Sequence, residues 1–110
     1  HCICYTGTHD NDTAVGWYDH ATAEEKAFVK AYLNADDAES TRRALLRAGQ
    51  GSVAELFVAQ MQDYLGLGSE ARVNVPGVAE DNWCWRMLPG QTTPALAEEI
   101  RGLTHTFSRC

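Results

Sequence analysis

The segment CICYTGTHDND, residues 2–12, passes from a hydrophobic run to a cluster of polar groups within a few positions. β-branched and aromatic side chains in its first half predict a short buried strand, and Gly7 marks where that strand stops. A histidine and two aspartates come next, at His9, Asp10 and Asp12. Loops that leave the carboxyl ends of parallel strands build the active sites of α/β proteins, so this order would place His9 and Asp10 at the functional end of a sheet.

The polar cluster allows two kinds of role. A carboxylate beside an imidazole can stabilise a developing cation, bind a sugar hydroxyl, act as a general base or hold a metal. Alternatively, Asx side chains in such a cluster simply bond the local backbone. For Asn11 and Asp12 we favour this local role, with Asp12 and Thr13 capping the next segment of the chain. For His9 and Asp10 the residues alone leave both roles open.

The next two segments predict helices. Residues 21–33 begin with Thr22 and Glu25 at the spacing of a capping box. The apolar stripe expected on this helix consists of Ala27, Phe28, Ala31 and Tyr32. Residues 37–49 form the second predicted helix, which we expect to stop at Gly49. Its apolar side consists of Ala44, Leu45 and Ala48.

Residues 52–68 fit two structures, and the hydrophobic period does not choose between them. Their apolar residues recur at helical spacing, but the run LFVAQM, residues 56–61, is equally typical of a short buried strand. Residues 69–91 come after them, with prolines, glycines and two tryptophans but no sustained period. Loops of this length and aromatic content are usually functional or fixed by another part of the protein.

The last segment predicts a helix over residues 92–107, with Thr93 as its cap and Pro94 in its first turn. Its common apolar face consists of Leu96, Ile100, Leu103 and Phe107. The whole order is then strand, polar loop, helices, possible strand, long loop and helix, which is the βαβα pattern of a parallel α/β fold. Because parallel strands are buried on both faces, two of them make an incomplete sheet, and we expect the chain to be part of a larger protein.

Candidate binding residues also occur in the long loop. Arg72 and Asn74 could face a polar cleft, and Trp83 and Trp85 could offer faces on which a ligand stacks. Equally, the tryptophans could pack the loop down, because their large apolar bodies favour burial, and Arg86 could form an ion pair. The residues leave both interpretations open.

Composition narrows the choice of partners. The chain has 110 residues and a net charge of −6, with only nine lysines and arginines, so we expect no nucleic-acid partner. No hydrophobic run reaches the ~20 residues that a membrane span needs, so we expect no membrane partner. No basic segment followed by an apolar core indicates secretion, and we therefore predict a cytoplasmic protein.

The four cysteines are Cys2, Cys4, Cys84 and Cys110. Together with His1 they offer the ligand types of zinc, but they contain no C-x-x-C pair and match no common spacing. A disulfide framework is also weakly supported, because the chain shows no secretory pattern. We expect reduced, mostly buried thiols, no metal site and no cofactor.

Two blocks of the sequence resemble one enzyme family. YTGTHDND, residues 5–12, with Gly16 and Trp17 shortly after it, resembles the end of the seventh barrel strand in amylomaltases. QDYLGLGSEARVNVPG, residues 62–77, followed by NWCWR, residues 82–86, resembles a second block of the same family. These enzymes are 4-α-glucanotransferases of glycoside hydrolase family 77, also called disproportionating enzymes. Both blocks keep their order and approximate spacing, so the resemblance covers nearly the whole chain.

The resemblance implies a fold. The catalytic domain of the family is a (β/α)₈ TIM barrel, and residues 1–110 would form its C-terminal part with no separate second domain. Residues 1–8 would be the seventh strand, residues 56–61 the eighth strand and residues 92–107 the closing helix. The exposed strand edges of such a fragment would favour self-association. One departure lies at Gln60, where the family pattern often has proline.

The resemblance also implies an activity. It is the transfer of an α-1,4-glucan segment to the 4-hydroxyl of an acceptor glucan or glucose, by a retaining double displacement. Asp10 would be the third acidic residue, which grips hydroxyls of the reacting sugar, and His9 would contact the same sugar. Asn74 would reach a donor-side sugar, and Arg72 would contact substrate or orient its loop. The nucleophilic Asp and the acid/base Glu would come from earlier strands, so we expect the isolated chain to be inactive.

The partners implied in this way are α-1,4-glucans, such as maltooligosaccharides derived from starch or glycogen. An alternative is a non-catalytic carbohydrate-binding or structural α/β fragment. A metal-dependent hydrolase that uses the HDND segment, residues 9–12, is a further possibility, but the other ligands that such an ion needs are missing.

Overall fold

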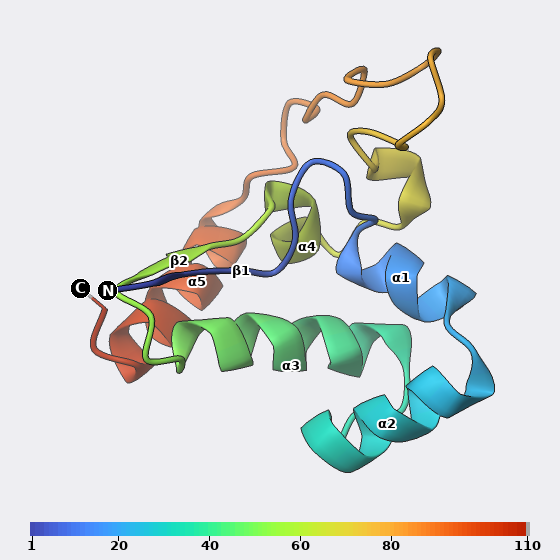
Figure 1. The fold of residues 1–110 in the computed structure, drawn as a ribbon. Helices are drawn as coiled ribbons and strands as arrows, with labels where there is room; N and C mark the ends of the chain where they lie inside the picture. The colour runs from blue at the N-terminus through green and yellow to red at the C-terminus, as the bar shows by residue number, and fades with distance from the viewer. Residues whose placement is uncertain (110) are drawn as a thin grey trace.

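The computed structural model describes residues 1–109 and contains, within that range, a two-stranded parallel sheet and five α-helices (Figure 1). The elements in chain order are β1 (Ile3–Tyr5), α1 (Ala14–His20), α2 (Ala23–Leu33), α3 (Ala38–Gln50), β2 (Leu56–Val58), α4 (Met61–Leu65), a 3-10 turn η1 (Ser69–Ala71) and α5 (Pro94–Thr106). The predicted α/β order is confirmed. Residues 52–68, for which the sequence left helix and strand open, contain both, first β2 and then α4.

Strands β1 and β2 lie side by side and run parallel (Figure 1). The paired residues are Ile3 with Leu56, Cys4 with Phe57 and Tyr5 with Val58. Each strand has three residues, so the strands predicted over residues 1–8 and 56–61 are too long. The last ladder bond runs from the Thr6 N–H to the Val58 carbonyl (3.2 Å). Past this bond one segment enters the polar loop, and the other turns into α4, which has Gln60 as its N-cap.

Helix α3 packs against one face of the sheet. The ring of Phe57 lies directly against Gly49, where an added Cβ would sit 2.0 Å from Phe57 Cε1. Helix α3 continues through Gly49 to Gln50, instead of stopping at Gly49 as predicted, and Gly51 is its C-cap. The opposite face of the sheet carries large exposed apolar side chains, namely Ile3, Tyr5, Leu56 and Val58.

Helix α2 has the predicted capping box, but it buries a different face from the one expected. The stripe of Ala27, Phe28, Ala31 and Tyr32 is exposed. Instead, Val29 joins Tyr18 and Ala35 in a small core, with Leu33 packed against it. Both faces of α2 are apolar in sequence, so only its packing against α1 and α3 selects the inner one. The exposed rings of Phe28 and Tyr32 stack on each other, with centroids 5.7 Å apart.

The predicted apolar side of α3 is only partly turned inward. Ala44 and Leu45 are half-buried, and Ala44 packs against the small core, whereas Ala48 is exposed.

Helix α3 also buries a side chain that its hydrophobic pattern does not indicate, since Arg42 is only 6% exposed. Arg42 donates hydrogen bonds to the carbonyl oxygens of Asp63 (3.0 Å) and Tyr64 (3.3 Å), and to the carboxylate of Glu39 (2.9 Å). The hydrogen bond from Arg42 lowers the pKa of Glu39 to about 2. A buried guanidinium thus joins α3 to α4.

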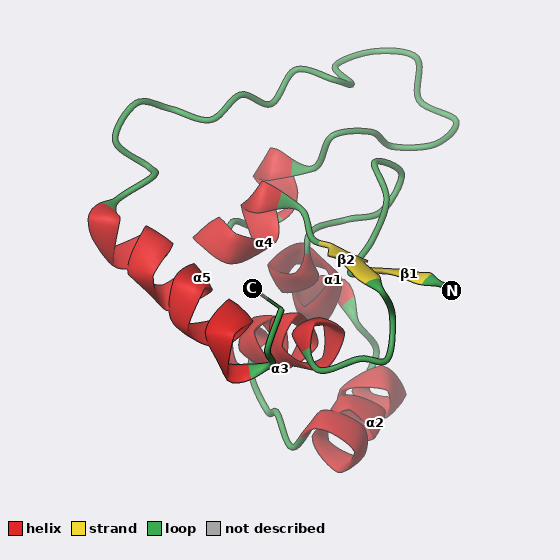
Figure 2. Ribbon diagram, turned by 90° about the vertical axis from the view of Figure 1, so that its left-hand side faces the viewer, coloured by secondary structure: helices red, strands yellow, loops and turns green. Residues whose placement is uncertain are grey.

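The closing helix is predicted well. Thr93 accepts a hydrogen bond from the Leu96 N–H (3.1 Å), Pro94 occupies the first turn, and the helix ends at Thr106. The predicted face of Leu96, Ile100, Leu103 and Phe107 is the half-buried one. A long irregular segment between η1 and α5 passes over the rest of the chain (Figure 2).

The cysteines differ from the prediction of buried thiols. Cys2 and Cys84 are exposed and Cys4 is half-buried, because their strand and loop lie at the surface, while Cys110 lies outside the described residues. Within residues 1–109, no group of three or more His, Cys, Asp or Glu side chains is placed to hold a metal ion. In the same range, no helix combines the length and hydrophobicity of a membrane span.

The contact between Gly49 and Phe57 gives a stability prediction with an unusual sign. Glycine inside a helix normally destabilises that helix, so a Gly→Ala substitution should raise the free energy of unfolding by up to ~1 kcal/mol. We expect this result for Gly102→Ala in α5, because no atom lies within 4 Å of the Cβ that alanine would add there. For Gly49→Ala we expect a loss of about 1–3 kcal/mol of unfolding free energy, because the new methyl group overlaps Phe57. Urea unfolding of both variants measures the difference. Equal stabilisation by the two substitutions would contradict the close packing of α3 on β2.

Candidate functional site

The loop that connects β1 to α1 is folded on itself by one side chain. The Asn11 amide oxygen accepts hydrogen bonds from the Thr8 N–H (2.7 Å) and the Thr8 hydroxyl (3.1 Å). The Thr8 hydroxyl oxygen also accepts from the Asp10 N–H (3.3 Å). Asn11 therefore has the local role predicted for it, and the tight turn leaves His9 and Asp10 at its exposed tip.

Both ends of this loop are held by a single buried carboxylate, Asp63 of α4, which is 3% exposed. Its Oδ2 accepts a hydrogen bond from the Thr6 hydroxyl (3.1 Å) at the end of β1. Its Oδ1 accepts one from the Ala14 N–H (2.8 Å) at the start of α1. Thr13, which is fully buried, caps α1 by accepting from the Gly16 N–H (3.0 Å). These contacts fix the path of the chain on either side of Asp10.

Asp12 joins the same loop to η1. Its Oδ1 accepts from the Thr13 N–H (2.8 Å), and its Oδ2 accepts from the Ser69 hydroxyl (2.7 Å). A Cβ at Gly16 would lie 2.4 Å from the Ser69 hydroxyl oxygen and 2.5 Å from Asp12 Oδ1. Glycine at this position thus lets α1 approach η1 closely enough for the Asp12–Ser69 bond.

The structure brings together all four site residues predicted from the sequence. Asn74 donates a hydrogen bond from Nδ2 to Asp10 Oδ1 (2.7 Å), and His9 Nε2 lies 3.3 Å from the same oxygen. Arg72 donates from Nη2 to the Asp10 carbonyl (2.7 Å) and from Nε to the Asn74 carbonyl (2.9 Å). Arg72 thus binds main-chain atoms of both loops, and Asn74 binds the carboxylate itself.

Two further residues complete the site. The ring of Trp83 lies against the ring of His9, with centroids 4.9 Å apart and planes tilted by 34°. Gln60 donates from Nε2 to the Thr8 carbonyl (2.6 Å). The sequence left Trp83 open between stacking and packing, and it gave Gln60 no role beyond its departure from the family pattern.

His9, Asp10, Gln60 and Trp83 border an open cleft of about 610 Å³ beyond the ends of β1 and β2. Its lining residues are Tyr5, Gly7, Thr8, His9, Asp10, Val58, Gln60, Gln62, Val73 and Trp83. Both side-chain contacts of Asp10 involve Oδ1, so within residues 1–109 its Oδ2 remains available to a ligand. A carboxylate, an imidazole and an aromatic face around an open cleft suit a ligand that has both hydroxyl groups and an apolar ring face.

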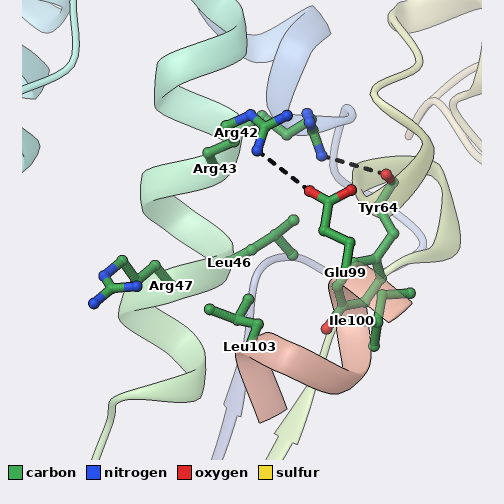
Figure 3. Close-up of a pocket in the computed structure, with 8 residues that line it drawn as sticks. All are labelled: Arg42, Arg43, Leu46, Arg47, Tyr64, Glu99, Ile100 and Leu103. Carbon is green, nitrogen blue, oxygen red and sulfur yellow. Dashed lines mark hydrogen bonds and ion pairs between the residues drawn. The ribbon is translucent and has the colours of Figure 1, made fainter. Parts of the chain in front are cut away.

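A smaller pocket of about 200 Å³ lies between α3, α4 and α5, and it shares no lining residue with the Asp10 cleft (Figure 3). Three arginines border it, but each already has a protein partner. Arg42 binds α4, Arg43 binds Glu99 (3.3 Å), and Arg47 lies over the ring of Phe107. Leu46, Ile100 and Leu103 also line it, so the pocket is a gap in the packing of three helices.

Comparison with known proteins identifies the family of this chain. A family model described as 4-alpha-glucanotransferase matches residues 1–92. This chain belongs to the 4-alpha-glucanotransferase family. The resemblance seen in the two sequence blocks is thereby confirmed.

Individual 4-alpha-glucanotransferases agree with this assignment. The enzyme from Thermus thermophilus is 47% identical over 113 residues, which cover 97% of this chain and 22% of the relative. The chloroplastic/amyloplastic enzyme from Solanum tuberosum is 41% identical over 111 residues, covering 97% of this chain and 19% of the relative. The chain therefore spans about a fifth of the length of these relatives.

A solved structure shows the same arrangement of the chain. The amylomaltase from Streptococcus agalactiae in complex with acarbose superimposes with a TM-score of 0.88 at 30% sequence identity. The match covers 96% of this chain and 21% of the amylomaltase chain. The fold of residues 1–109 is thus similar to that of the corresponding part of a 4-alpha-glucanotransferase.

Asp63 should stabilise the site loop strongly. Asp63→Ala leaves the Ala14 N–H and the Thr6 hydroxyl without their acceptor, and we expect it to lower the free energy of unfolding by about 2 kcal/mol or more. Asp36→Ala is the control, because the side chain removed there is exposed and forms a surface ion pair with Lys30 (3.6 Å). We expect this variant to change the free energy of unfolding by less than about 0.5 kcal/mol. Urea unfolding compares the two variants. Equal small losses would show that Asp63 does not hold the loop.

Proposed function

We propose that this chain supplies part of the sugar-binding site of an enzyme that transfers α-1,4-glucan segments to the 4-hydroxyl of an acceptor glucan or glucose. The observation that carries the proposal is the Asp10 carboxylate, which is held by Asn74 and His9 at an open cleft beyond the two parallel strands. The acarbose complex of the similar amylomaltase supports a ligand of this class.

The proposed reaction is a retaining double displacement. One carboxylate attacks the anomeric carbon to form a glycosyl-enzyme, and a carboxylic acid protonates the leaving oxygen and then activates the acceptor hydroxyl. We assign these two groups to an Asp and a Glu outside the present chain. Asp10 then acts as the third acidic residue. Its bonds to hydroxyls of the reacting sugar contribute to catalysis to the extent that they strengthen in the transition state.

Three other residues of the site have proposed roles. His9, beside Asp10, is proposed to bind the same sugar. Asn74 has an amide that already reaches the Asp10 carboxylate, and we propose that it also contacts a donor-side sugar. Arg72 is best described as a residue that orients the two loops, because its guanidinium donates to the main-chain carbonyl oxygens of Asp10 and Asn74.

The two strands are proposed to be neighbours in a TIM barrel. The support is the exposed face of Ile3, Tyr5, Leu56 and Val58, because barrel interiors are packed with large apolar side chains from each strand. The helices α3 and α5 would then belong to the outer ring. The division of the chain as 1–110, one part of the catalytic barrel, remains a prediction, as does the cytoplasmic location.

The role of Asp10 is tested in the complete protein that contains this chain. We expect Asp10→Asn to lower kcat for disproportionation of maltotriose to glucose and longer glucans by a factor on the order of 10³, because the amide keeps the shape but loses the charge. Asp19→Asn, at an exposed position on α1, should leave kcat unchanged. Glucose release over time gives both values. Wild-type activity in Asp10→Asn would disprove the assigned role.

The present chain by itself should not catalyse the transfer, because it is proposed to lack the nucleophile and the acid/base. We expect no glucose release from maltotriose by the purified chain. Glucose release by the chain alone would contradict the proposal.

A non-catalytic carbohydrate-binding protein is the second candidate. Binding of maltotriose by the chain, followed by NMR, would favour this candidate if the complete protein is also inactive.

The open strand edges of the purified chain are proposed to favour self-association. Sedimentation at several concentrations of the same sample tests this.

A further inference from the structure

Trp83 adopts a backbone conformation that a tryptophan rarely takes. Its φ is +60°, and Asp81, two residues earlier, has φ +59°. Residues with a Cβ are disfavoured in this left-handed region, and such strain persists only where the surrounding structure imposes it. Burial does not explain the conformation, because Trp83 is 64% exposed within the described chain. The loop therefore holds an exposed indole in a strained position.

Hydrogen bonds within the loop impose this conformation. The backbone N–H of Trp83 donates a hydrogen bond to the Val73 carbonyl (2.7 Å), which brings the end of the loop back to its beginning. The Asn82 side chain bridges the interior, because its oxygen accepts from the Val75 N–H (2.9 Å) and its nitrogen donates to the Val78 carbonyl (2.6 Å). Residues 73–83 thus form a closed loop that fixes where the indole points.

The indole points at His9. The two ring centroids are 4.9 Å apart, and His9 Nε2 lies 3.3 Å from Asp10 Oδ1. The His9 side chain is 53% exposed and stands on a loop, so without a neighbour its imidazole could turn about both side-chain torsions. Trp83 covers one face of the ring and restricts that rotation.

We infer that Trp83 is a positioning residue, whose indole keeps the His9 imidazole in the orientation that faces the Asp10 carboxylate. The expected effect of Trp83 on catalysis rests on the proposed function. The contact between the two rings stands independently of it. The left-handed backbone at residue 83 then has a role, because a relaxed backbone there would direct the indole elsewhere.

The two left-handed residues provide a matched pair of variants. Trp83→Gly and Asp81→Gly both relieve the backbone, since glycine tolerates this region, but only the first removes the ring beside His9. We expect neither variant to melt below the wild type. Trp83→Phe is the conservative variant, because it retains an aromatic face. All three are made in the complete protein that contains this chain.

Activity on maltotriose gives the first readout. We expect kcat/KM to fall at least about tenfold in Trp83→Gly, because small misplacements of an active-site group are costly, and to stay within about threefold of wild type in Trp83→Phe and Asp81→Gly. Unchanged activity in Trp83→Gly would overturn the inference. So would an equal loss in Asp81→Gly, because the effect would then come from the loop and not from the ring.

Motion of the imidazole gives the second readout. Carbon-13 relaxation at His9 Cε1 reports ring motion on the picosecond to nanosecond timescale, and the signal is assigned from its loss in His9→Gln. We expect larger motion in Trp83→Gly and wild-type motion in Asp81→Gly. Unchanged motion in Trp83→Gly would refute the positioning role. If the wild-type protein does not act on maltotriose, the proposed function fails, and this relaxation measurement alone then decides whether Trp83 positions His9.

Discussion

The carboxylate of Asp63 is the contact on which the site depends. It is buried, and it accepts hydrogen bonds from the last residue of the β1 ladder and from the first residue of α1. Its own backbone is held by Arg42 of α3. Burying a carboxylate is unfavourable unless its oxygens are bonded, so Asp63, Thr6 and Ala14 must keep their relative positions. The loop that bears Asp10 spans the interval between those two fixed points.

The site is shared between two segments that meet only in the folded chain. Asp10 and His9 come from the loop after β1, whereas Asn74, Arg72 and Trp83 come from the segment after α4. Because Arg72 bonds to main-chain oxygens in both segments, it fixes the distance between them without using the Asp10 carboxylate. Within residues 1–109, one oxygen of that carboxylate therefore stays available to a ligand, while the other is held by Asn74.

The sequence predicted the features that depend only on residues close together in the chain. The capping box of α2, the Thr93 cap and the face of α5 need only neighbouring residues, and they are where the sequence placed them. The inner face of α2 and the Arg42 side of α3 depend on tertiary partners, which a hydrophobic period does not contain. At the site, the family resemblance indicated His9, Asp10, Arg72 and Asn74, which do converge. The strain at Trp83 had no sequence signal, because a positive φ is expected at glycine or asparagine.

The separation of these residues along the chain also bears on folding. The Asn74–Asp10 bond joins residues 64 positions apart, and the intervening chain contains the helices α1 to α4 and the second strand. Contacts between distant residues form slowly, because the entropy of closing the connecting chain is lost before the contact is gained. Helices α1 to α3 can therefore be in place during synthesis while Asp10 still lacks Asn74. The cleft should be among the last features of this segment to mature, and a chain interrupted before residue 74 would carry Asp10 without the amide that holds it.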